Sequence, residues 1–499
     1  MTAPLPDVPS GFSSLELGSR ALQHLHETGF HERNLARLTR GFTIDVSDPR
    51  VRDSVLPAAD PNTPLGALLR LFSIGADVTL SQAEAALGSV DVSDWERAGF
   101  LTVDSRESVR ALVTLSSFGG FTVASDRHPM ETGDASSVMN VSLSTLSLAR
   151  LMIPGPPVAR AADIGCGSGL LALLLSRGAA EVVATDAEPR ALAFTALNAR
   201  WNGVSSIRCV EGDGITPLVG TRFDRVLSNP PLVLGPAGGF RYARGGDSFV
   251  ESLVRGLPRI LADEGVAQLL AHWAFDPEKP AAILEWFDRA EADRGPDDLE
   301  VDAQVWCSRT MPIEAYVQQW IATDPDPRES APKWLAHFQE KGISQIAEGL
   351  LNLRATAAAG PKLRSLDPAP PRMDGETPRE LLIGFRRQEY LRRHAGEALR
   401  RAVVHPHPGI QIVQETEART DGWASPTLRL ARAIPIARSR PIEGPILSLV
   451  TRCDRSTSLG SIIDGIIEGG NDAERAQLLE VARELIALGF LDGPDFEEK

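Results

Sequence analysis

Cysteine and tyrosine are scarce in this chain of 499 residues, which holds only four cysteines and three tyrosines. No Cys-x-x-Cys pair or Cys/His cluster is formed by the four widely spaced cysteines, Cys166, Cys209, Cys307 and Cys453. This spacing indicates neither a disulfide framework nor a zinc site, and it suits a reducing compartment. No apolar run reaches the roughly 18 residues of a membrane span, and the first residues lack the basic and apolar segments of a signal peptide. We therefore expect a cytoplasmic protein with no membrane segment and no metal site.

Positive charge is also in deficit, since the formal net charge is -15. A strong negative charge opposes non-specific attraction to a phosphate backbone, so nucleic-acid binding would need a local basic patch. The arginines within residues 386–401 are the candidate for such a patch. The hydrophobic fraction of 43% and the charged fraction of 23% are ordinary for globular chains and exclude wholesale disorder.

The length predicts two or three domains, because single cores rarely grow beyond roughly 250–300 residues. Helical spacing followed by β-branched segments predicts a helical or winged-helix-like N-terminal domain over residues 1–130. Strands and helices then alternate over residues 131–358, which predicts an α/β domain with a parallel sheet. A proline-rich linker over residues 359–377 and a mainly helical C-terminal domain over residues 378–499 complete the chain.

A glycine-rich loop carries the strongest chemical signal. Residues 163–169 form the sequence Asp-Ile-Gly-Cys-Gly-Ser-Gly, after an apolar strand and before a helical run. Glycine at Gly165, Gly167 and Gly169 lets the backbone turn sharply and approach a ligand, while the helix N-terminus supplies unpaired N–H groups. The pattern, with Asp163 ahead of the first glycine, predicts a cofactor-binding loop. A tight strand-to-helix connection without a ligand is the alternative.

Two further carboxylates end the next two predicted strands. Asp186 closes the second strand, where a carboxylate can accept hydrogen bonds from both hydroxyls of a ribose. Asp213 closes the third strand, where it or its backbone can contact an adenine amino group. Helix capping is the alternative for Asp186, and turn formation is the alternative for Asp213.

The fourth strand ends in Asn229-Pro230-Pro231. With this motif, residues 161–275 resemble the class I S-adenosylmethionine-dependent methyltransferases, and in particular the methyltransferase small domain family. That group methylates planar nitrogens and includes release-factor glutamine methyltransferases and ribosomal RNA adenine or guanine N-methyltransferases. The resemblance implies a Rossmann-like α/β fold with a parallel-dominated seven-stranded sheet, flanked by the two extensions. It also implies S-adenosyl-L-methionine as the cofactor.

The resemblance assigns expected roles to the motifs. The loop of residues 163–169 would hold the methionine end of the cofactor, Asp186 the ribose and Asp213 the adenine. Asn229 is expected to serve both the cofactor and the acceptor. An amide or exocyclic amine is a weak nucleophile, so acceptors on its N–H groups must orient its lone pair toward the methyl group. The side-chain carbonyl of Asn229 and the backbone carbonyl of Pro230 would supply them without a strong base, whereas simple turn formation is the alternative.

The chain departs from the family pattern after the second proline. The family usually has tyrosine or phenylalanine there, to stack on a planar acceptor, and this chain has Leu232 beside Pro231. The loss disfavours a flipped base, because recognition of bases depends on stacking. In the glycine-rich stretch that follows, Tyr242 or Phe240 is expected to cover the acceptor, and Arg241 and Arg244 are expected to contact an acidic group. A flexible surface loop without either role is the alternative.

Three rival functions follow. The first is methylation of a nitrogen in a macromolecular acceptor, either a protein glutamine or an RNA base. The second is methylation of a small metabolite or peptide, and the third is a catalytically inert, cofactor-sensing regulator that binds DNA. Three tempting acid–base candidates, Asp126, His128 and His272, are interpreted as hydrogen-bonding residues, and the sequence indicates no oligomeric state.

Overall fold

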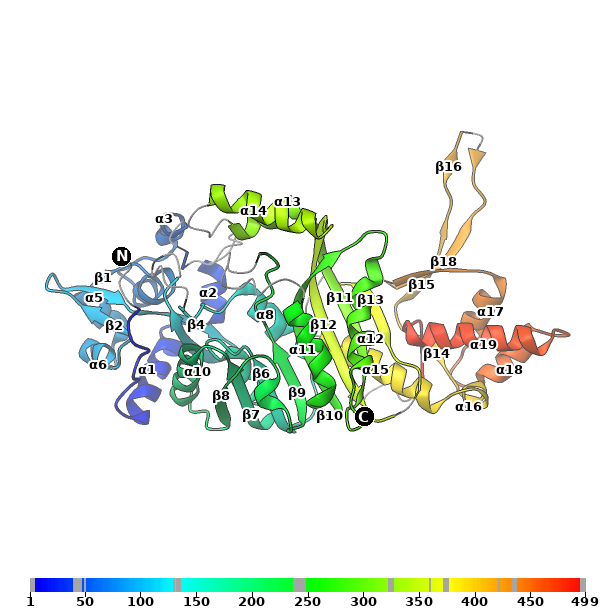
Figure 1. Ribbon diagram of the computed structural model, residues 1–499, viewed down its shortest axis with the longest axis horizontal. Helices are drawn as coiled ribbons and strands as arrows, with labels where there is room; N and C mark the ends of the chain where they lie inside the picture. The colour runs from blue at the N-terminus through cyan, green and yellow to red at the C-terminus, as the bar shows by residue number, and fades with distance from the viewer. Residues whose placement is uncertain are drawn as a thin grey trace. The chain divides into compact units, whose positions relative to one another are not determined.

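The computed structural model describes residues 5–38, 47–48, 51–128, 131, 136–236, 248–321, 327–358, 360–370, 377–420, 422–432 and 438–493 (Figure 1). The chain divides into two compact units. The first comprises Met1–Ala149, Pro156–Leu299 and Met311–Ile346, and the second comprises Arg150–Gly155, Glu300–Thr310 and Ala347–Lys499.

The first unit begins with short helices and a small sheet. The helices are α1 (Leu15–Glu27), α2 (Glu32–Leu38), α3 (Arg52–Val55), α4 (Pro64–Leu68), α5 (Leu80–Leu87) and α6 (Val92–Arg97). The strands are β1 (Val78–Thr79), β2 (Leu101–Val103) and β3 (Ser108–Ala111), in the antiparallel order β1-β3-β2. Local sequence sets the start of α5, where the Thr79 hydroxyl accepts from the Gln82 N–H and the Gln82 side chain accepts from the Thr79 N–H.

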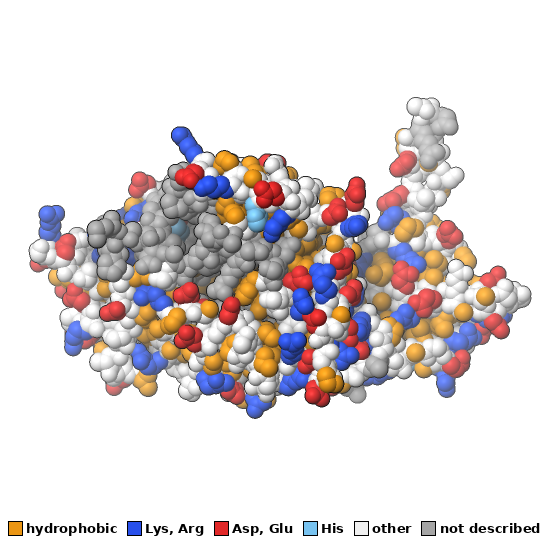
Figure 2. Space-filling view, viewed as in Figure 1, with side chains coloured by type: hydrophobic (Ala, Val, Ile, Leu, Met, Phe, Trp, Pro, Cys, Tyr) orange, Lys and Arg blue, Asp and Glu red, His pale blue; other side chains and the backbone are white. Residues whose placement is uncertain are grey.

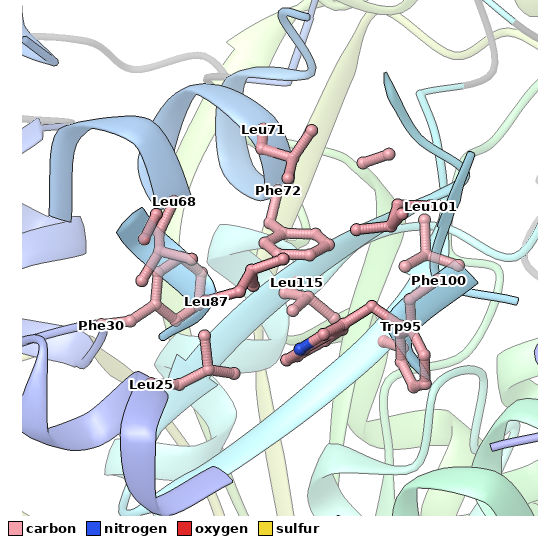
Figure 3. Packing of buried hydrophobic residues seen from close by; sticks show 14 of the residues in the cluster. Leu25, Phe30, Leu68, Leu71, Phe72, Leu87, Trp95, Phe100, Leu101 and Leu115 are labelled. Carbon is pink, nitrogen blue, oxygen red and sulfur yellow. The ribbon is translucent and has the colours of Figure 1, made fainter. Parts of the chain in front are cut away.

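An apolar core holds these elements together. Its aromatic centre brings Phe72, Trp95 and Phe100 into contact beside leucines from α1, α4 and α5 (Figure 3). The same cluster includes Trp201 and Phe194, which lie on α10 (Pro189–Trp201) of the following α/β region. The N-terminal region and the α/β region therefore share one core.

The first unit also contains a parallel sheet. Five strands follow the order β10-β9-β6-β7-β8, and each neighbouring pair is parallel. They are β6 (Val158–Ile164), β7 (Ala179–Asp186), β8 (Ile207–Glu211), β9 (Phe223–Ser228) and β10 (Leu261–Phe275). The helices along this segment are α8 (Leu143–Arg150), α9 (Leu170–Leu175), α10, α11 (Ser248–Gly256) and α12 (Glu285–Ala292). This order, with β6 in the middle, confirms the Rossmann-like α/β fold predicted from the sequence, and the unit alone holds five of the seven expected strands.

A separate hairpin, β4 (Val113–Phe118) with β5 (Phe121–Asp126), is joined to this region by two carboxamides, one in the last turn of α10 and one at its C-cap. Asn198 accepts from the Ala124 N–H at 2.8 Å and donates to the Ala124 carbonyl at 2.8 Å. Asn202, one helical turn later, repeats the pattern on Thr122 at 3.1 and 2.7 Å. The two side chains pair with the β5 backbone where a neighbouring strand would otherwise do so.

The second unit contains more β-structure than the sequence predicted. Its helices are α15 (Thr377–Arg393), α16 (Glu397–Arg401), α17 (Gly444–Arg452), α18 (Leu459–Ile466) and α19 (Asp472–Ala487). A three-stranded antiparallel sheet consists of β15 (Ile410–Glu415), β18 (Thr427–Arg432) and β19 (Arg438–Ile442). Between β15 and β18 the chain forms a second short antiparallel pair, β16 (Ala418–Arg419) with β17 (Gly422–Trp423), which extends beyond the sheet in Figure 1. A two-stranded pair joins β14 (His405–Pro406) to β20 (Leu491–Asp492).

The remaining strands are β11 (Glu300–Pro312), β12 (Gln345–Thr356) and β13 (Arg364–Pro368). β13 pairs in parallel with β11 and lies within residues 359–377, which the sequence analysis treated as a linker. The prolines in that stretch favoured an irregular linker and did not reveal the short strand.

Asn198 generates the first prediction. Asn198→Ala should lower the free energy of unfolding by about 2–4 kcal/mol, because it leaves the buried backbone groups of Ala124 unpaired. Urea unfolding followed by fluorescence would measure the loss. Asn202→Ala, at a half-buried position, is the matched control and should cost less. An Asn198→Ala protein as stable as the wild type would contradict the structural role of this carboxamide.

Candidate functional site

The glycine-rich loop joins β6 to α9. Gly165, Gly167 and Gly169 have φ angles of 73°, 54° and 85°, in the region that glycine adopts without strain. A Cβ atom at Gly165 or Gly167 would meet nothing within 4 Å, so open space adjoins the loop at both positions. A Cβ atom at Gly169 would lie 2.8–3.1 Å from Thr195. The first two glycines thus leave room beside the backbone, whereas the third allows the close packing of α9 and α10.

Asp186 ties the loop to the end of β7. Its carboxylate accepts from the Gly167 N–H at 3.0 Å and from the Glu188 N–H at 3.0 Å. The second bond closes a turn just before α10, whose N-cap residue is Glu188 and has no side-chain cap. Asp186 therefore shapes the loop directly, in addition to any contact with a ligand.

Asp163 lies beneath the loop, fully buried. One oxygen, Oδ2, accepts from the Ala172 N–H at 2.9 Å, while Oδ1 has no hydrogen-bond partner within the described structure. Burial raises the pKa of Asp163 to about 7, and the nearby charge of Asp186 acts in the same direction. Buried polar atoms normally have a hydrogen-bond partner, and Asp163 Oδ1, at the base of this loop, has none among the described residues.

The strand ends lie along one edge of the sheet, as the sequence predicted. Ile164 pairs with Thr185, and Asp186 pairs with Glu211, so the ends of β6, β7 and β8 follow one another. Asp213 lies just beyond β8 and is exposed, and its backbone carbonyl accepts from the Thr216 N–H at 3.2 Å. This bond matches the turn that was proposed as the alternative role, and it leaves the carboxylate at the surface.

Asn229 follows β9 at the same edge, next to α8. Its Nδ2 donates to the Thr145 hydroxyl at 2.9 Å and to the Ser144 hydroxyl at 3.1 Å. The Ser142 hydroxyl in turn lies 2.7 Å from Ser144 and 3.0 Å from Thr145. No hydrogen bond among the described residues uses Asn229 Oδ1, so the amide is oriented with its carbonyl oxygen available as an acceptor.

Sequence reasoning did not identify Ser144 and Thr145 as partners of Asn229. About 85 residues separate these hydroxyls from the motif. Serine and threonine at a helix start are most often caps, so their composition gave no distinctive signal. Pro231 is half-buried, as is Leu232. Phe240, Arg241, Tyr242 and Arg244 lie outside the described residues.

Two of the three acid–base candidates, Asp126 and His272, have side-chain hydrogen-bond partners. Asp126 is paired with Arg190, at 2.7 Å to Nε, and it accepts from the Val138 N–H at 2.7 Å. His272 Nδ1 lies 2.9 Å from the Tyr316 hydroxyl. Both groups are buried in these contacts, which matches their interpretation as hydrogen-bonding residues.

Cys166, in the middle of the loop, is also buried. The Thr195 hydroxyl donates to its sulfur at 3.3 Å. Burial raises the pKa of the Cys166 thiol well above its usual value, and the carboxyls of Asp163 and Asp186 raise it further. The side chain is therefore a neutral packing group.

None of the helices in the described residues combines the length and the apolar character of a membrane span. Within the same ranges, no three or more His, Cys, Asp or Glu side chains are grouped so that they could hold a metal ion.

The raised pKa of Asp163 generates the second prediction. Because the folded protein favours the protonated carboxyl, its stabilising contribution is present below about pH 4 and is lost as the pH rises to about 7. Asp163→Asn keeps the shape without the charge, so the melting temperature of the variant relative to wild type should rise by several degrees between pH 5 and pH 8. Thermal melts at both pH values would measure this. An unchanged difference would contradict the buried, proton-linked position of Asp163.

Comparison with known proteins agrees with this geometry. The profile of the methyltransferase small domain family matches residues 143–279, and a domain family of unknown function, DUF7059, matches residues 27–112. The chain is 43% identical over 76 residues to the release factor glutamine methyltransferase of Xylella fastidiosa (strain 9a5c), covering 15% of this chain and 28% of the relative. It is 36% identical over 118 residues to the ribosomal RNA small subunit methyltransferase C of Sodalis glossinidius, and this alignment covers 23% of this chain and 31% of the relative.

A solved structure of ribosomal protein L11 methylase from Lactobacillus delbrueckii subsp. bulgaricus is 19% identical, with 34% of this chain and 74% of that chain covered and a TM-score of 0.25. The alignments with the two curated relatives span less than a third of each relative's length. The family match over residues 143–279 includes the glycine loop, the aspartates at the strand ends and Asn-Pro-Pro. Residues 143–279 are therefore similar to the methyltransferase small domain family, and the strands of this region have the order of a Rossmann-like fold.

Proposed function

We propose that this protein is an S-adenosylmethionine-dependent methyltransferase that acts on a nitrogen atom of a macromolecular acceptor. The observation that carries the proposal is the orientation of Asn229. Its amide nitrogen is engaged by Ser144 and Thr145, so its carbonyl oxygen is left to accept an N–H, at the sheet edge that also bears the glycine loop. A turn-forming asparagine would not require such an arrangement.

The described residues fit S-adenosyl-L-methionine. Open space adjoins Gly165 and Gly167, and Asp163 retains an unpartnered oxygen below the loop. In the proposal, the loop and Asp163 hold the methionine end, Asp186 the ribose and Asp213 the adenine end. When bound, the cofactor supplies a methyl group made electrophilic by its sulfonium.

The role of the chain's own residues is to orient the nucleophile. Asn229 Oδ1 and the Pro230 carbonyl accept the N–H protons of the acceptor, which directs the nitrogen lone pair at the methyl group. Two successive prolines restrict the backbone that carries the Pro230 carbonyl. Because proximity and alignment supply most of the acceleration in such a transfer, no strong base is required.

Within the macromolecular class, a protein side-chain amide is favoured over an RNA base. Four of the six arginines in the candidate basic patch are engaged in ion pairs: Arg387 with Glu380 and Asp492, Arg392 with Asp302, Arg393 with Glu389, and Arg400 with Asp464. Basic and acidic side chains are interspersed on the face drawn in Figure 2. The relative named release factor glutamine methyltransferase points the same way.

Two other acceptors keep a specific observation in their favour. The ribosomal RNA methyltransferase relative aligns over the longer stretch, 118 residues, which supports an RNA base. Leu232 in place of a stacking aromatic supports a small metabolite or peptide. The inert-regulator alternative is disfavoured, because the whole set from Asp163 to Asn229 is retained.

Transfer of a tritiated methyl group separates these acceptors. The full chain would be incubated with labelled S-adenosyl-L-methionine and, in parallel, unmethylated bacterial release factor, unmethylated ribosomal RNA and a glutamine-containing peptide. Label in the release factor, removed when its glutamine is substituted, is the expected result. Label in the RNA alone would replace the protein acceptor by the base, and label in none would overturn the macromolecular proposal.

A third prediction concerns the cofactor. Asp186→Ala should weaken binding of S-adenosyl-L-methionine about ten- to a hundred-fold, or roughly 1.5–3 kcal/mol, because ribose contacts and the Gly167 hydrogen bond are lost together. Isothermal titration calorimetry would measure it. The control is Asp224→Ala, since Asp224 lies near the start of β9, where it accepts from the Arg160 N–H. Undiminished binding by Asp186→Ala would refute the assignment.

A fourth prediction concerns the chemical step. Asn229→Ala should lower kcat by about a hundred-fold or more and change cofactor affinity by only a few-fold, because the side chain aligns the acceptor nitrogen. The Ser144→Ala, Thr145→Val double variant should lower kcat less, since Asn229 remains but is no longer oriented. Asn62→Ala, at an exposed loop position, is the control. Near-normal turnover by Asn229→Ala would exclude nitrogen methylation at this motif.

A further inference from the structure

The segment that follows Asn-Pro-Pro is enclosed by a pair of helices that the matched family does not cover. These are α13 (Ile313–Ile321) and α14 (Pro327–Glu340), well beyond residues 143–279. Val233 and Leu234, only 3% and 2% exposed, belong to one apolar cluster with these helices. Its other buried members are Met311, Ile313, Tyr316, Val317, Ile321, Trp334, Phe338 and Ile346. The chain after the motif is therefore a packed segment.

Close packing extends to the next residue. A Cβ atom at Gly235 would lie 2.9–3.2 Å from the indole ring of Trp334, which is too close for any other amino acid without movement of the ring. The backbone at Gly235 thus lies directly against α14, and this contact limits how far the segment can shift.

One hydroxyl bonds this segment to the protein interior. Tyr316, which is fully buried, accepts from the Leu234 N–H at 2.9 Å. The same oxygen lies 2.9 Å from His272 Nδ1, on β10. The phenol accepts from Leu234, and its own O–H donates to Nδ1 in the tautomer that carries the ring proton on Nε2. The buried Leu234 N–H obtains the partner that burial demands of a backbone donor.

We propose that Tyr316 is a positioning residue for methyl transfer, which holds the Asn-Pro-Pro loop through the Leu234 N–H. The inference rests on the proposed function. Leu234 lies four residues after Pro230, whose carbonyl is one of the two acceptors assigned to the substrate nitrogen. Asn229 is held from the other side by Ser144 and Thr145 of α8. The two hydrogen-bond acceptors of the site are thus fixed between α8 and α13.

Loss of the Tyr316 hydroxyl should slow methyl transfer because the reaction depends on precise alignment of the reacting atoms. Transfer of a methyl group requires the nitrogen, the methyl carbon and the sulfur in line, and a displacement of about 1 Å can cost on the order of a hundred-fold in rate. Loss of the hydroxyl leaves a buried N–H without a partner, so the segment is expected to shift or to fluctuate. This movement would lower kcat. It would leave the cofactor loop unaffected, because that loop follows a different strand.

Tyr316→Phe tests the proposal, because it removes the hydroxyl and keeps the ring in its apolar cluster. We expect kcat on the acceptor labelled in the tritium assay to fall at least ten-fold, with the dissociation constant of S-adenosyl-L-methionine changed less than three-fold. Amide exchange at Leu234, followed by mass spectrometry of peptides containing it, should become faster. A purely structural role would instead alter the melting temperature without this split between turnover and cofactor binding.

Tyr390→Phe is the matched control, since Tyr390 is also a buried tyrosine and belongs to the second unit. It should leave kcat and the exchange at Leu234 at wild-type values. A Tyr316→Phe protein with wild-type kcat would overturn the positioning role whether or not the exchange at Leu234 changes, and it would leave the proposed function intact. A wild-type chain that transfers no methyl group would overturn both.

Discussion

A single buried carboxamide, that of Asn198, connects the parts of the first unit on which the candidate site depends. It bonds both backbone groups of Ala124 in the β4–β5 hairpin, and it donates to the Ser168 carbonyl in the glycine loop at 2.8 Å. One side chain thus fixes the N-terminal hairpin, α10 and the ligand loop relative to one another. Because a buried amide is costly to leave unpaired, all three partners must be in place together.

This arrangement explains why the N-terminal region and the parallel sheet form one compact unit. The shared core that includes Trp201 and Phe194 buries apolar surface. The side-chain amides of Asn198 and Asn202 fix the orientation of the hairpin through directional hydrogen bonds. Arg190 on the same helix adds a pair with buried Asp126. α10 therefore has two roles: it connects β7 to β8 of the sheet, and it packs against the N-terminal region.

The sequence revealed the parts of the site that depend on local chemistry and missed those that depend on distant contacts. The glycine loop, the aspartates at the strand ends and Asn-Pro-Pro each carry a recognisable pattern over a few residues, and the structure brings them to one sheet edge. The hydroxyls of Ser144, Thr145 and Tyr316 have no such pattern, because their function comes only from the neighbour that folding provides. The β13 strand was missed for a related reason, since its pairing with β11 depends on residues about 60 positions away.

Cys166 gives the cofactor loop one further property. Its thiol is enclosed beside Thr195, and burial raises its pKa, so it remains protonated at neutral pH. Oxidants and electrophiles react with exposed thiolates, and this sulfur is neither exposed nor ionised. A cysteine at the centre of a ligand loop would ordinarily make the site vulnerable to peroxide or to alkylating agents. Here the glycine loop should remain chemically inert under oxidative stress.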